Sequence, residues 1–283
     1  MNNTKATTAE IIKGYFVEKY PKREIVIRRF EESLEEEMTW DSFTNYNLYT
    51  FIENLRSVVS NNSAKTYAAQ MKSFLNLHLP KCKGLSNGWE KLLSIREIES
   101  THITLTEEEV GKIIQYAMDS SNSESKRNVA ATFAVCCVTG ARWDDAYTFK
   151  DCDLSGKTFK YISKKTDVIA EIPVSPVLRA LAFDLRKIHI TAYNKIIKSI
   201  CKELNINSEV SVFKGGVALR GAKWEFVSSH TARQSFATNL YNRGADLEII
   251  SKMMGHTTYQ QTKRYINSDL ELLDENIIGF FNK

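Results

Sequence analysis

Residues 128–140 read Asn-Val-Ala-Ala-Thr-Phe-Ala-Val-Cys-Cys-Val-Thr-Gly, a stretch that is apolar almost throughout. A helix without a polar face has to be covered by other elements, so this segment predicts a buried helix inside a domain. Gly140 is expected to end it, because glycine readily takes the left-handed conformation that closes a helix. Any fold for this chain has to surround that helix.

The length of 283 residues predicts two domains, each long enough to bury its own core. Residues 1–79 show the spacing of about four helices, including one over 24–36 and one capped by Asp41. Residues 80–103 are basic and rich in helix breakers, which is typical of a linker. Thr106 and Glu109 have the spacing of a capping box, so a second domain is predicted over 104–283.

Two short strand pairs are expected inside this second domain. Residues 158–163 and 168–174 alternate and predict a hairpin, with Lys164 and Lys165 between them. A second pair is predicted over 210–213 and 224–227, joined by a loop over 214–223. From His230 onward the pattern is helical, with breaks near Gly244 and Gly255. The expected fold class is mainly α with small β-hairpins (α+β).

The composition excludes several classes of protein. No apolar stretch approaches the length of a membrane span, and residues 1–30 lack the pattern of a signal peptide. The cysteines are five in number and form no Cys-x-x-Cys pair, which favours reduced thiols, a cytoplasmic location and no structural zinc. A net charge of +4 is compatible with nucleic acid, but a binding face would need clustered cations.

A group of polar residues in the C-terminal half suits chemistry on a phosphodiester. His230 and Arg233 are three residues apart on a predicted helix and share one face. His256 follows 23 residues after Arg233, Tyr265 lies nine residues further on, and Arg142 comes well upstream. A tyrosine can act as a reversible nucleophile, and an arginine grips two phosphate oxygens with a permanent charge.

These motifs resemble the catalytic set of the tyrosine recombinases, the phage-integrase family. The resemblance rests on Thr-Gly-Ala-Arg at 139–142, on His230-x-x-Arg233 and on Gly255-His256 nine residues before Tyr265. It implies that Tyr265 forms a 3′-phosphotyrosyl bond and that Arg142, Arg233 and His256 hold the scissile phosphate. His230 would assist proton transfer at the tyrosine.

The resemblance also assigns supporting roles. Asp145, three residues after Arg142, would buttress that arginine. Lys165, on the predicted hairpin, would protonate the leaving 5′-oxygen, although the neighbouring Lys164 competes for this role. No metal, ATP or other cofactor would be required, because the cationic side chains stabilise the developing charge.

The implied protein is a site-specific DNA recombinase of a mobile genetic element that integrates, excises or inverts DNA. Residues 1–79 would be the core-DNA-binding domain, with no arm-binding module before it, and a tetramer would assemble on two duplex recombination sites. The apolar segment Leu270–Phe281 would pack into a neighbouring protomer or fold back on its own domain. The candidate phosphate contacts are Lys65, Lys72, Lys81 and Lys83.

Each motif alone has a simpler explanation. His230 and Arg233 could form a solvated helix face, Tyr265 could be a half-buried aromatic residue, and the lysines could be solubilising. Their joint order and spacing favour catalysis. Three alternatives stay open: a DNA-binding regulator without catalysis, an enzyme of the type IB topoisomerase kind, and a structural helical protein. The DNA sequence acted on and the direction of the reaction are not encoded in these motifs.

Overall fold

The computed structural model describes residues 6–98, 100–214 and 216–266, and the chain divides into two compact units. The first unit comprises residues 1–100 with 213–217, and the second comprises residues 101–212 with 218–283. The predicted segment Leu270–Phe281 lies outside the described residues. Among the helices that the structure describes, none is long and apolar enough to cross a membrane.

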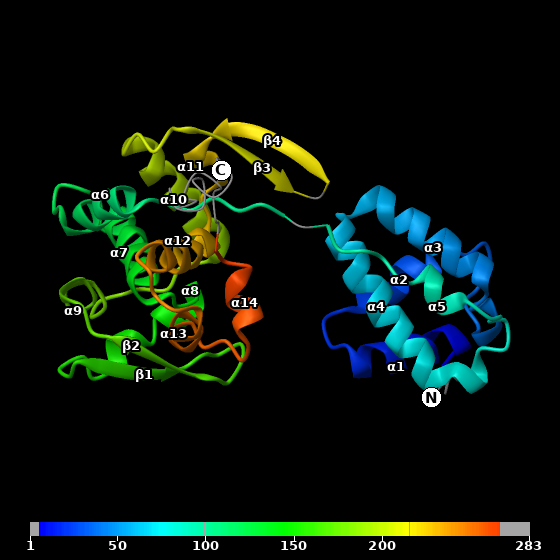
Figure 1. Cartoon of the computed structure of the whole chain (residues 1–283). Helices are drawn as coiled ribbons and strands as arrows, with labels where there is room; N and C mark the ends of the chain where they lie inside the picture. The colour runs from blue at the N-terminus through cyan, green and yellow to red at the C-terminus, as the bar shows by residue number, and fades with distance from the viewer. Residues whose placement is uncertain (1–5, 99, 215, 267–283) are drawn as a thin grey trace, which may run out of the picture. The chain divides into compact units, whose positions relative to one another are not determined.

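Four main helices build the first unit around an aromatic core. Phe30 stacks on Phe43 and meets Phe51 edge-on, while Phe74 packs against Phe16. All five rings are fully buried. The elements are α1 (Thr8–Lys19), α2 (Glu24–Glu31), η1 (Trp40–Ser42), α3 (Asn45–Val58), α4 (Asn61–His78), η2 (Leu79–Lys81) and α5 (Trp89–Leu92) (Figure 1).

Two predicted boundaries in this unit are wrong. Asp41 does not cap α3, because it lies inside η1, and Thr44 accepts the capping hydrogen bond from Asn47 N at 3.1 Å. The second helix ends at Glu31 instead of residue 36. Just beyond that end, the Ser33 hydroxyl donates to the Phe30 carbonyl at 2.6 Å. Local hydroxyl bonds of this kind compete with continuation of a helix.

Much of segment 80–103 packs on the first unit. Cys82, Trp89, Leu93 and Ile95 are buried in its core. Asn62 of α4 then pairs with the backbone of Ile98, donating to its carbonyl at 2.9 Å and accepting from its N–H at 3.1 Å. This segment is therefore held to α4 as far as residue 98.

Helix α7 (Glu124–Thr139) forms the centre of the second unit and is covered on several sides, as predicted (Figure 1). It ends at Gly140, whose φ of 68° confirms the predicted left-handed cap. The predicted capping box of Thr106 and Glu109 is also present. The surrounding helices are α6 (Glu107–Met118), α8 (Trp143–Ala146), α9 (Pro176–Leu181), α10 (Ile190–Glu203) and α12 (Ser229–Asn242).

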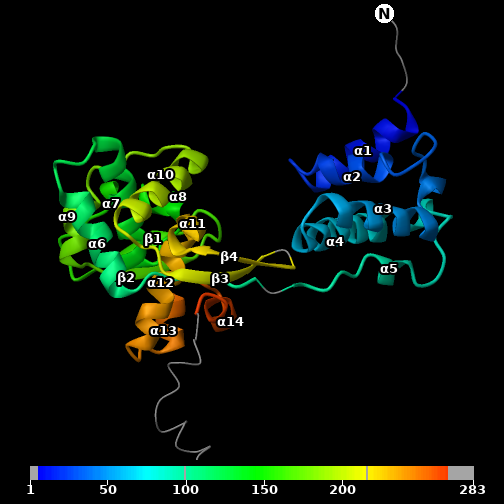
Figure 2. The same cartoon turned by 90° about the horizontal axis from the view of Figure 1, so that it is seen from above.

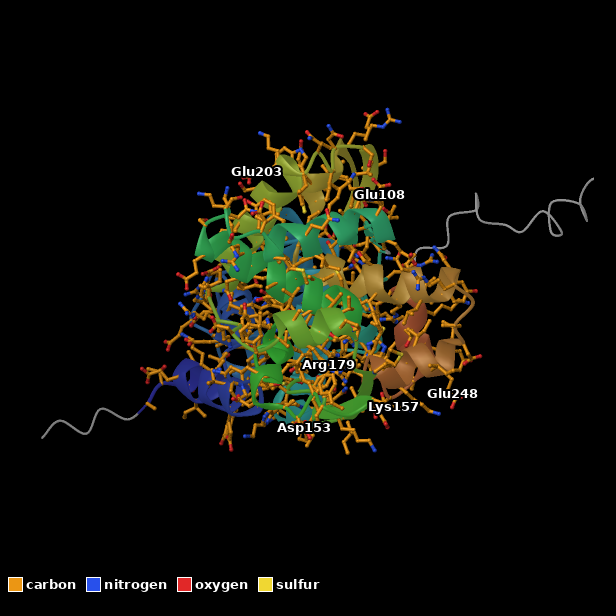
Figure 3. All side chains as sticks on the ribbon, turned by 90° about the vertical axis from the view of Figure 1, so that its left-hand side faces the viewer. Glu108, Asp153, Lys157, Arg179, Glu203 and Glu248 are labelled. Atoms are coloured by element: carbon orange, nitrogen blue, oxygen red, sulfur yellow. The ribbon has the colours of Figure 1, made fainter. Side chains whose placement is uncertain are left out.

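The predicted hairpin of this unit is confirmed. Strand β1 (Thr158–Ile162) pairs antiparallel with β2 (Ile169–Pro173), with Tyr161 opposite Ala170. Arg179 of α9 donates to the carbonyls of Leu154 and Gly156 at 3.0 Å each, which fixes the loop that leads into β1. Figure 3 labels Arg179 near Asp153 and Lys157 at the two ends of that loop. The turn after β1 carries Lys164 and Lys165.

The second strand pair differs from its prediction. Strand β3 (Glu209–Lys214) pairs with β4 (Val217–Ala222), and residues 223–226 form the short helix α11 (Lys223–Phe226) (Figure 2). Most of β4 is solvent-exposed, so its sequence lacks the alternation of buried and exposed residues that marks a strand. Two further helices, α13 (Leu247–Met253) and α14 (Tyr259–Lys263), follow α12, with the predicted breaks at Gly244 and Gly255.

The described chain is therefore mainly α-helical with two small hairpins, which confirms the expected fold class. Helix α13 packs against β2, and a Cβ at Gly255, two residues after the helix, would be in ordinary van der Waals contact with Ala170 at 3.4 Å. The hairpin turn, the start of α8, the helix α12 and the segment after α13 thus all belong to one unit.

Candidate active site

Arg142 leaves the end of the central helix through a tight turn. It is the N-cap residue of α8, two positions after Gly140. A Cβ at Gly140 would lie 2.4 Å from the ring of Phe236, and its φ is positive, so glycine is required there on two grounds. This close approach brings the α7–α8 turn against α12, which carries His230 and Arg233.

Arg233 is the largest fully buried side chain of the described residues, with 1% of its surface exposed. Its guanidinium donates to the carbonyl oxygen of Gly140 and, at 2.6 Å, to that of Met254. These oxygens lie at the C-terminal ends of α7 and α13, where helix dipoles place partial negative charge. Backbone oxygens with partial negative charge thus hold this buried guanidinium in place.

His256 contacts this guanidinium directly. Its Nε2 lies 2.7 Å from Nη2 of Arg233, and its Nδ1 lies 2.9 Å from Oγ1 of Thr262. An arginine only donates, so Nε2 is assigned as the acceptor and Nδ1–H as the donor to Thr262. Burial, reinforced by the charges of Arg233 and Arg142, lowers the pKa of His256 to about 4. The imidazole is therefore neutral at physiological pH.

Tyr265 lies beside both groups. The guanidinium carbon of Arg233 is 5.5 Å from the centre of its ring, and the His256 ring centre is 5.3 Å away. The hydroxyl of Thr238 in α12 donates to the Tyr265 carbonyl at 3.1 Å. The Tyr265 N–H donates to the backbone carbonyl of Thr262 at 2.8 Å. The backbone of the predicted nucleophile is thus fixed from two sides.

Arg142 is half-buried and anchored by a serine. Its Nη1 donates to Oγ of Ser163 at 2.6 Å, and that hydroxyl donates to Oδ2 of Asp145 at 2.9 Å. Asp145 therefore acts on Arg142 through Ser163, and its Oδ1 accepts from the backbone N–H of Lys164 at 3.0 Å. Burial is the largest cause that lowers the pKa of Arg233, and the positive charge of Arg142 is the next. The two guanidiniums are thus close enough for the charge of one to act on the other.

His230 and Lys165 lie at the more open side of this group. His230 is exposed in the first turn of α12, one turn before Arg233. Partial burial lowers the pKa of His230, and the positive charges of Lys165 and Arg233 lower it further. Lys165 is thus close enough to act on His230. The ammonium of Lys164 is directed to the Asp144 carbonyl at 3.4 Å, which leaves Lys165 as the better placed of the two lysines.

The structure thus brings together all six residues predicted for catalysis and the supporting Asp145 (Arg142, Lys165, His230, Arg233, His256, Tyr265). Their catalytic roles remain predictions. Within residues 6–98, 100–214 and 216–266, no three His, Cys, Asp or Glu side chains are grouped so that they could hold a metal ion.

The four lysines predicted to contact phosphates lie in the first unit. Three of them contact neighbouring groups of that unit, and the fourth is exposed. Lys65 pairs with Glu97 at 2.6 Å, and Lys72 donates to the Glu90 carbonyl at 3.5 Å. The Lys81 ammonium lies 4.8 Å and 5.0 Å from the ring centres of Tyr15 and Trp40. Lys83 is exposed. Their role in DNA binding stays a prediction.

Sequence reasoning missed several residues that hold the group in place. Ser163 and Thr262 have no motif of their own, although Thr262 lies three residues before Tyr265, a spacing that places both on one helical face. Thr238 lies five residues after Arg233 in α12. Met254 contributes only its carbonyl oxygen, for which a sequence carries no side-chain signal.

Comparisons of sequence match this chain to known proteins. The model of the phage integrase family matches residues 104–271. The integrase of Escherichia phage P2 is 22% identical over 180 residues, covering 61% of this chain and 45% of that protein. The integrase of Haemophilus phage HP1 is 22% identical over 171 residues, covering 60% and 45%. The matched region thus spans less than half the length of these two phage integrases.

Solved structures show the same fold. The Tn1549 transposon integrase in complex with transposon right end DNA has a TM-score of 0.68 at 13% identity, covering 98% of this chain and all (100%) of the other. A lambda integrase dimer bound to a COC′ core site has a TM-score of 0.64 at 14% identity, covering 92% and 97%.

Proposed function

The chain belongs to the phage integrase family, and from this we propose that it is a site-specific DNA recombinase that cleaves and rejoins strands through a 3′-phosphotyrosyl intermediate. The observation that carries the proposal is the pairing of Arg233 and His256 beside the Tyr265 ring, with Arg142 close enough for its charge to act on both. Two permanent cations and an imidazole around one phenol suit a phosphate that becomes pentavalent during the reaction.

In the proposed reaction, the phenolic oxygen of Tyr265 attacks the scissile phosphorus and forms an O–P bond. The bond from phosphorus to the 5′-oxygen breaks, and Lys165 gives a proton to that oxygen. His230 takes the phenolic proton, for which its lowered pKa is suitable because the imidazole is neutral and can accept. The 5′-hydroxyl of another strand then reverses these steps, so the bond energy is retained.

Duplex DNA is the proposed partner, and four protomers are proposed to assemble on two recombination sites. The first unit, including residues 80–98 that pack on it, would form a core-DNA-binding domain, and the residues from 104 onward would form the catalytic domain. The solved relatives that are bound to DNA support duplex DNA as the ligand class.

The direct test is a covalent adduct. The full chain is incubated with nicked duplexes made from the DNA that flanks its gene, so that the cleaved strand diffuses away, and a denaturing gel separates protein from adduct. Wild type should form the adduct and Tyr265→Phe should not. Tyr259→Phe is the matched control, because Tyr259 is an exposed tyrosine at the start of α14. An adduct with Tyr265→Phe, or none with wild type, would refute the mechanism.

Two other functions predict different results. A DNA-binding regulator without catalysis would bind these duplexes but yield no adduct. An enzyme of the type IB topoisomerase kind would form the adduct and relax supercoils, yet would not join strands from two DNA molecules. The complete set of cations around Tyr265 favours the recombinase over the regulator.

A further inference from the structure

A buried chain of hydrogen bonds links the hairpin to the first arginine. Arg142 Nη1 donates to Ser163 Oγ at 2.6 Å, and Ser163 Oγ donates to Asp145 Oδ2 at 2.9 Å. Ser163 directly follows β1 and is completely buried, while Asp145 is 1% exposed. Water is therefore kept away from the middle of this chain.

Chemistry fixes the direction of each hydrogen bond. An arginine can only donate, and a carboxylate can only accept, so the single hydroxyl proton of Ser163 has to point to Asp145. Its lone pairs then face Arg142. The other oxygen of Asp145 accepts from the Lys164 N–H at 3.0 Å, so both carboxylate oxygens are used as acceptors.

The intervening hydroxyl changes what the carboxylate does. A direct, two-pronged Arg–Asp pair would occupy the guanidinium and offset its charge. With Ser163 between them, the guanidinium is oriented through one of its N–H groups while its remaining donors stay available to a phosphate. The same carboxylate also holds the backbone of the turn that carries Lys165, so the positions of two cations are coupled.

We propose that Ser163 is a positioning residue for Arg142 and that Asp145 sets the direction of its hydroxyl. This inference rests on the proposed function, because it concerns the same phosphate clamp. The carbonyl of Ser163 accepts from the N–H groups of Thr166 and Asp167 at 3.2 Å and 2.9 Å, and these turn contacts do not involve the side chain. A side-chain substitution therefore tests the hydroxyl separately from the turn.

The test compares Ser163→Ala with Ser235→Ala in single-turnover adduct formation. Ser235 is the matched control, because it is equally buried and makes two hydrogen bonds, to Leu105 N and Thr231 O, at 2.8 Å and 2.7 Å. Ser163→Ala should slow adduct formation about 100-fold, as expected for a misplaced catalytic group, and Ser235→Ala should not. DNA affinity should change little in either variant.

A second substrate separates positioning from general structure. A methylphosphonate at the scissile position lacks one negatively charged oxygen, so the reaction depends less on the clamp. The penalty of Ser163→Ala should shrink on this substrate, and Ser163→Thr, which keeps the hydroxyl, should recover activity on the ordinary phosphate. Equal penalties on both substrates, or a rate like that of Ser235→Ala, would overturn the inference while wild-type activity upholds the proposed function.

Asp145→Asn provides an independent check if Ser163→Ala is unstable. An amide offers one acceptor oxygen where two donors need one each, so the hydroxyl of Ser163 or the Lys164 N–H loses its partner. The same substrate-dependent slowing is expected, and a wild-type rate would overturn the inference. If wild type itself forms no adduct, the proposed function fails and this inference fails with it.

Discussion

The described core of the first unit is apolar, whereas the second unit buries hydroxyls and a guanidinium as well as phenylalanine rings. Among the residues that the structure describes, every buried polar or charged side chain lies between Thr132 and Thr262. The core of the first unit is apolar, with five fully buried phenylalanines. Burying a polar group is unfavourable unless it is hydrogen-bonded, so the concentration of buried polar side chains in one unit needs an explanation.

The contrast separates a unit with an apolar core from a unit whose buried polar groups fix a cluster of charged and aromatic side chains. In the second unit the buried polar groups fix Arg142, Arg233, His256 and Tyr265 in one place. In the first unit, Lys65 has a partner at the surface, where it stays accessible to solvent. A surface of that kind can contact a phosphate backbone without a rigid geometry.

The largest effect is expected from Arg233→Lys. An ammonium is a point charge that cannot serve both carbonyls and the imidazole in one plane, so adduct formation should slow about 1,000-fold. Quenched single-turnover assays measure the rate. Arg243→Lys is the matched control, because Arg243 caps the same helix but pairs at the surface with Glu107. A loss below tenfold for Arg233→Lys would show that the buried guanidinium is not part of the clamp.

Phe74→Ala should have the largest effect on stability in the first unit. Removing this buried ring is expected to lower the free energy of unfolding by about 3–5 kcal/mol, because a cavity remains. Urea titrations followed by fluorescence can locate the loss, since Trp40 and Trp89 lie in the first unit and Trp143 and Trp224 in the second.

Phe74→Leu leaves a smaller cavity and should cost less. If Phe74→Ala were instead as stable as wild type, the aromatic core would not be the source of stability in this unit.

The third effect is a dependence of stability on pH that arises in the second unit. The folded protein lowers the pKa of His256 from its ordinary value of 6.5 to about 4, so between these values the unfolded chain binds the proton more tightly. This contribution to stability is therefore complete above pH 6.5 and falls with decreasing pH, by about 1.4 kcal/mol per pH unit at most.

His256→Gln should reduce the dependence of the free energy of unfolding on pH between about 4 and 6.5. Chemical denaturation at a series of pH values measures it, and NMR titration of the imidazole gives the pKa directly. The lowered pKa of His230 contributes in both proteins and cancels in the difference. Parallel curves for wild type and variant would show that burial and the charge of Arg233 do not lower the pKa of His256.

The smallest effect concerns Lys65. Its pair with Glu97 is at the surface, so Lys65→Gln should change the free energy of unfolding by less than about 1 kcal/mol. If Lys65 contacts a phosphate, the slope of log affinity against log salt concentration should fall by about one. Lys13→Gln removes a comparable surface pair, with Glu31, and serves as the control. An unchanged slope for Lys65→Gln would remove it from the DNA-binding face.

Local signals account for what was predictable. Gly140, the capping box of Thr106 and Glu109, and the hairpin before Pro173 each depend on neighbours in the chain, and all three are confirmed. The spacing of His230, Arg233, His256 and Tyr265 was also readable, because each contributes a side chain of distinctive chemistry. Their convergence is now a structural observation, while their roles await the adduct assay.

Partners from distant segments account for what was missed. Strand β4 is defined by pairing with β3 and has little buried surface, so its residues carry no pattern. Segment 80–98 is rich in helix-breaking residues, which predicts a linker. Its buried residues are spaced too irregularly to indicate a helix (Cys82, Trp89, Leu93, Ile95). They are buried by helices that lie far away in the chain.

The two carbonyls that hold Arg233 have a genetic consequence. A point mutation exchanges a side chain and leaves the peptide oxygen in place, so no codon change at Met254 deletes its contact with the guanidinium. Such a change acts only by shifting the backbone, and the positions that shape it are Gly140 and Gly255, both with positive φ. In a saturation mutagenesis screen, loss of these carbonyl contacts should therefore appear as loss of activity at the two glycines, although neither has a side chain that contacts Arg233.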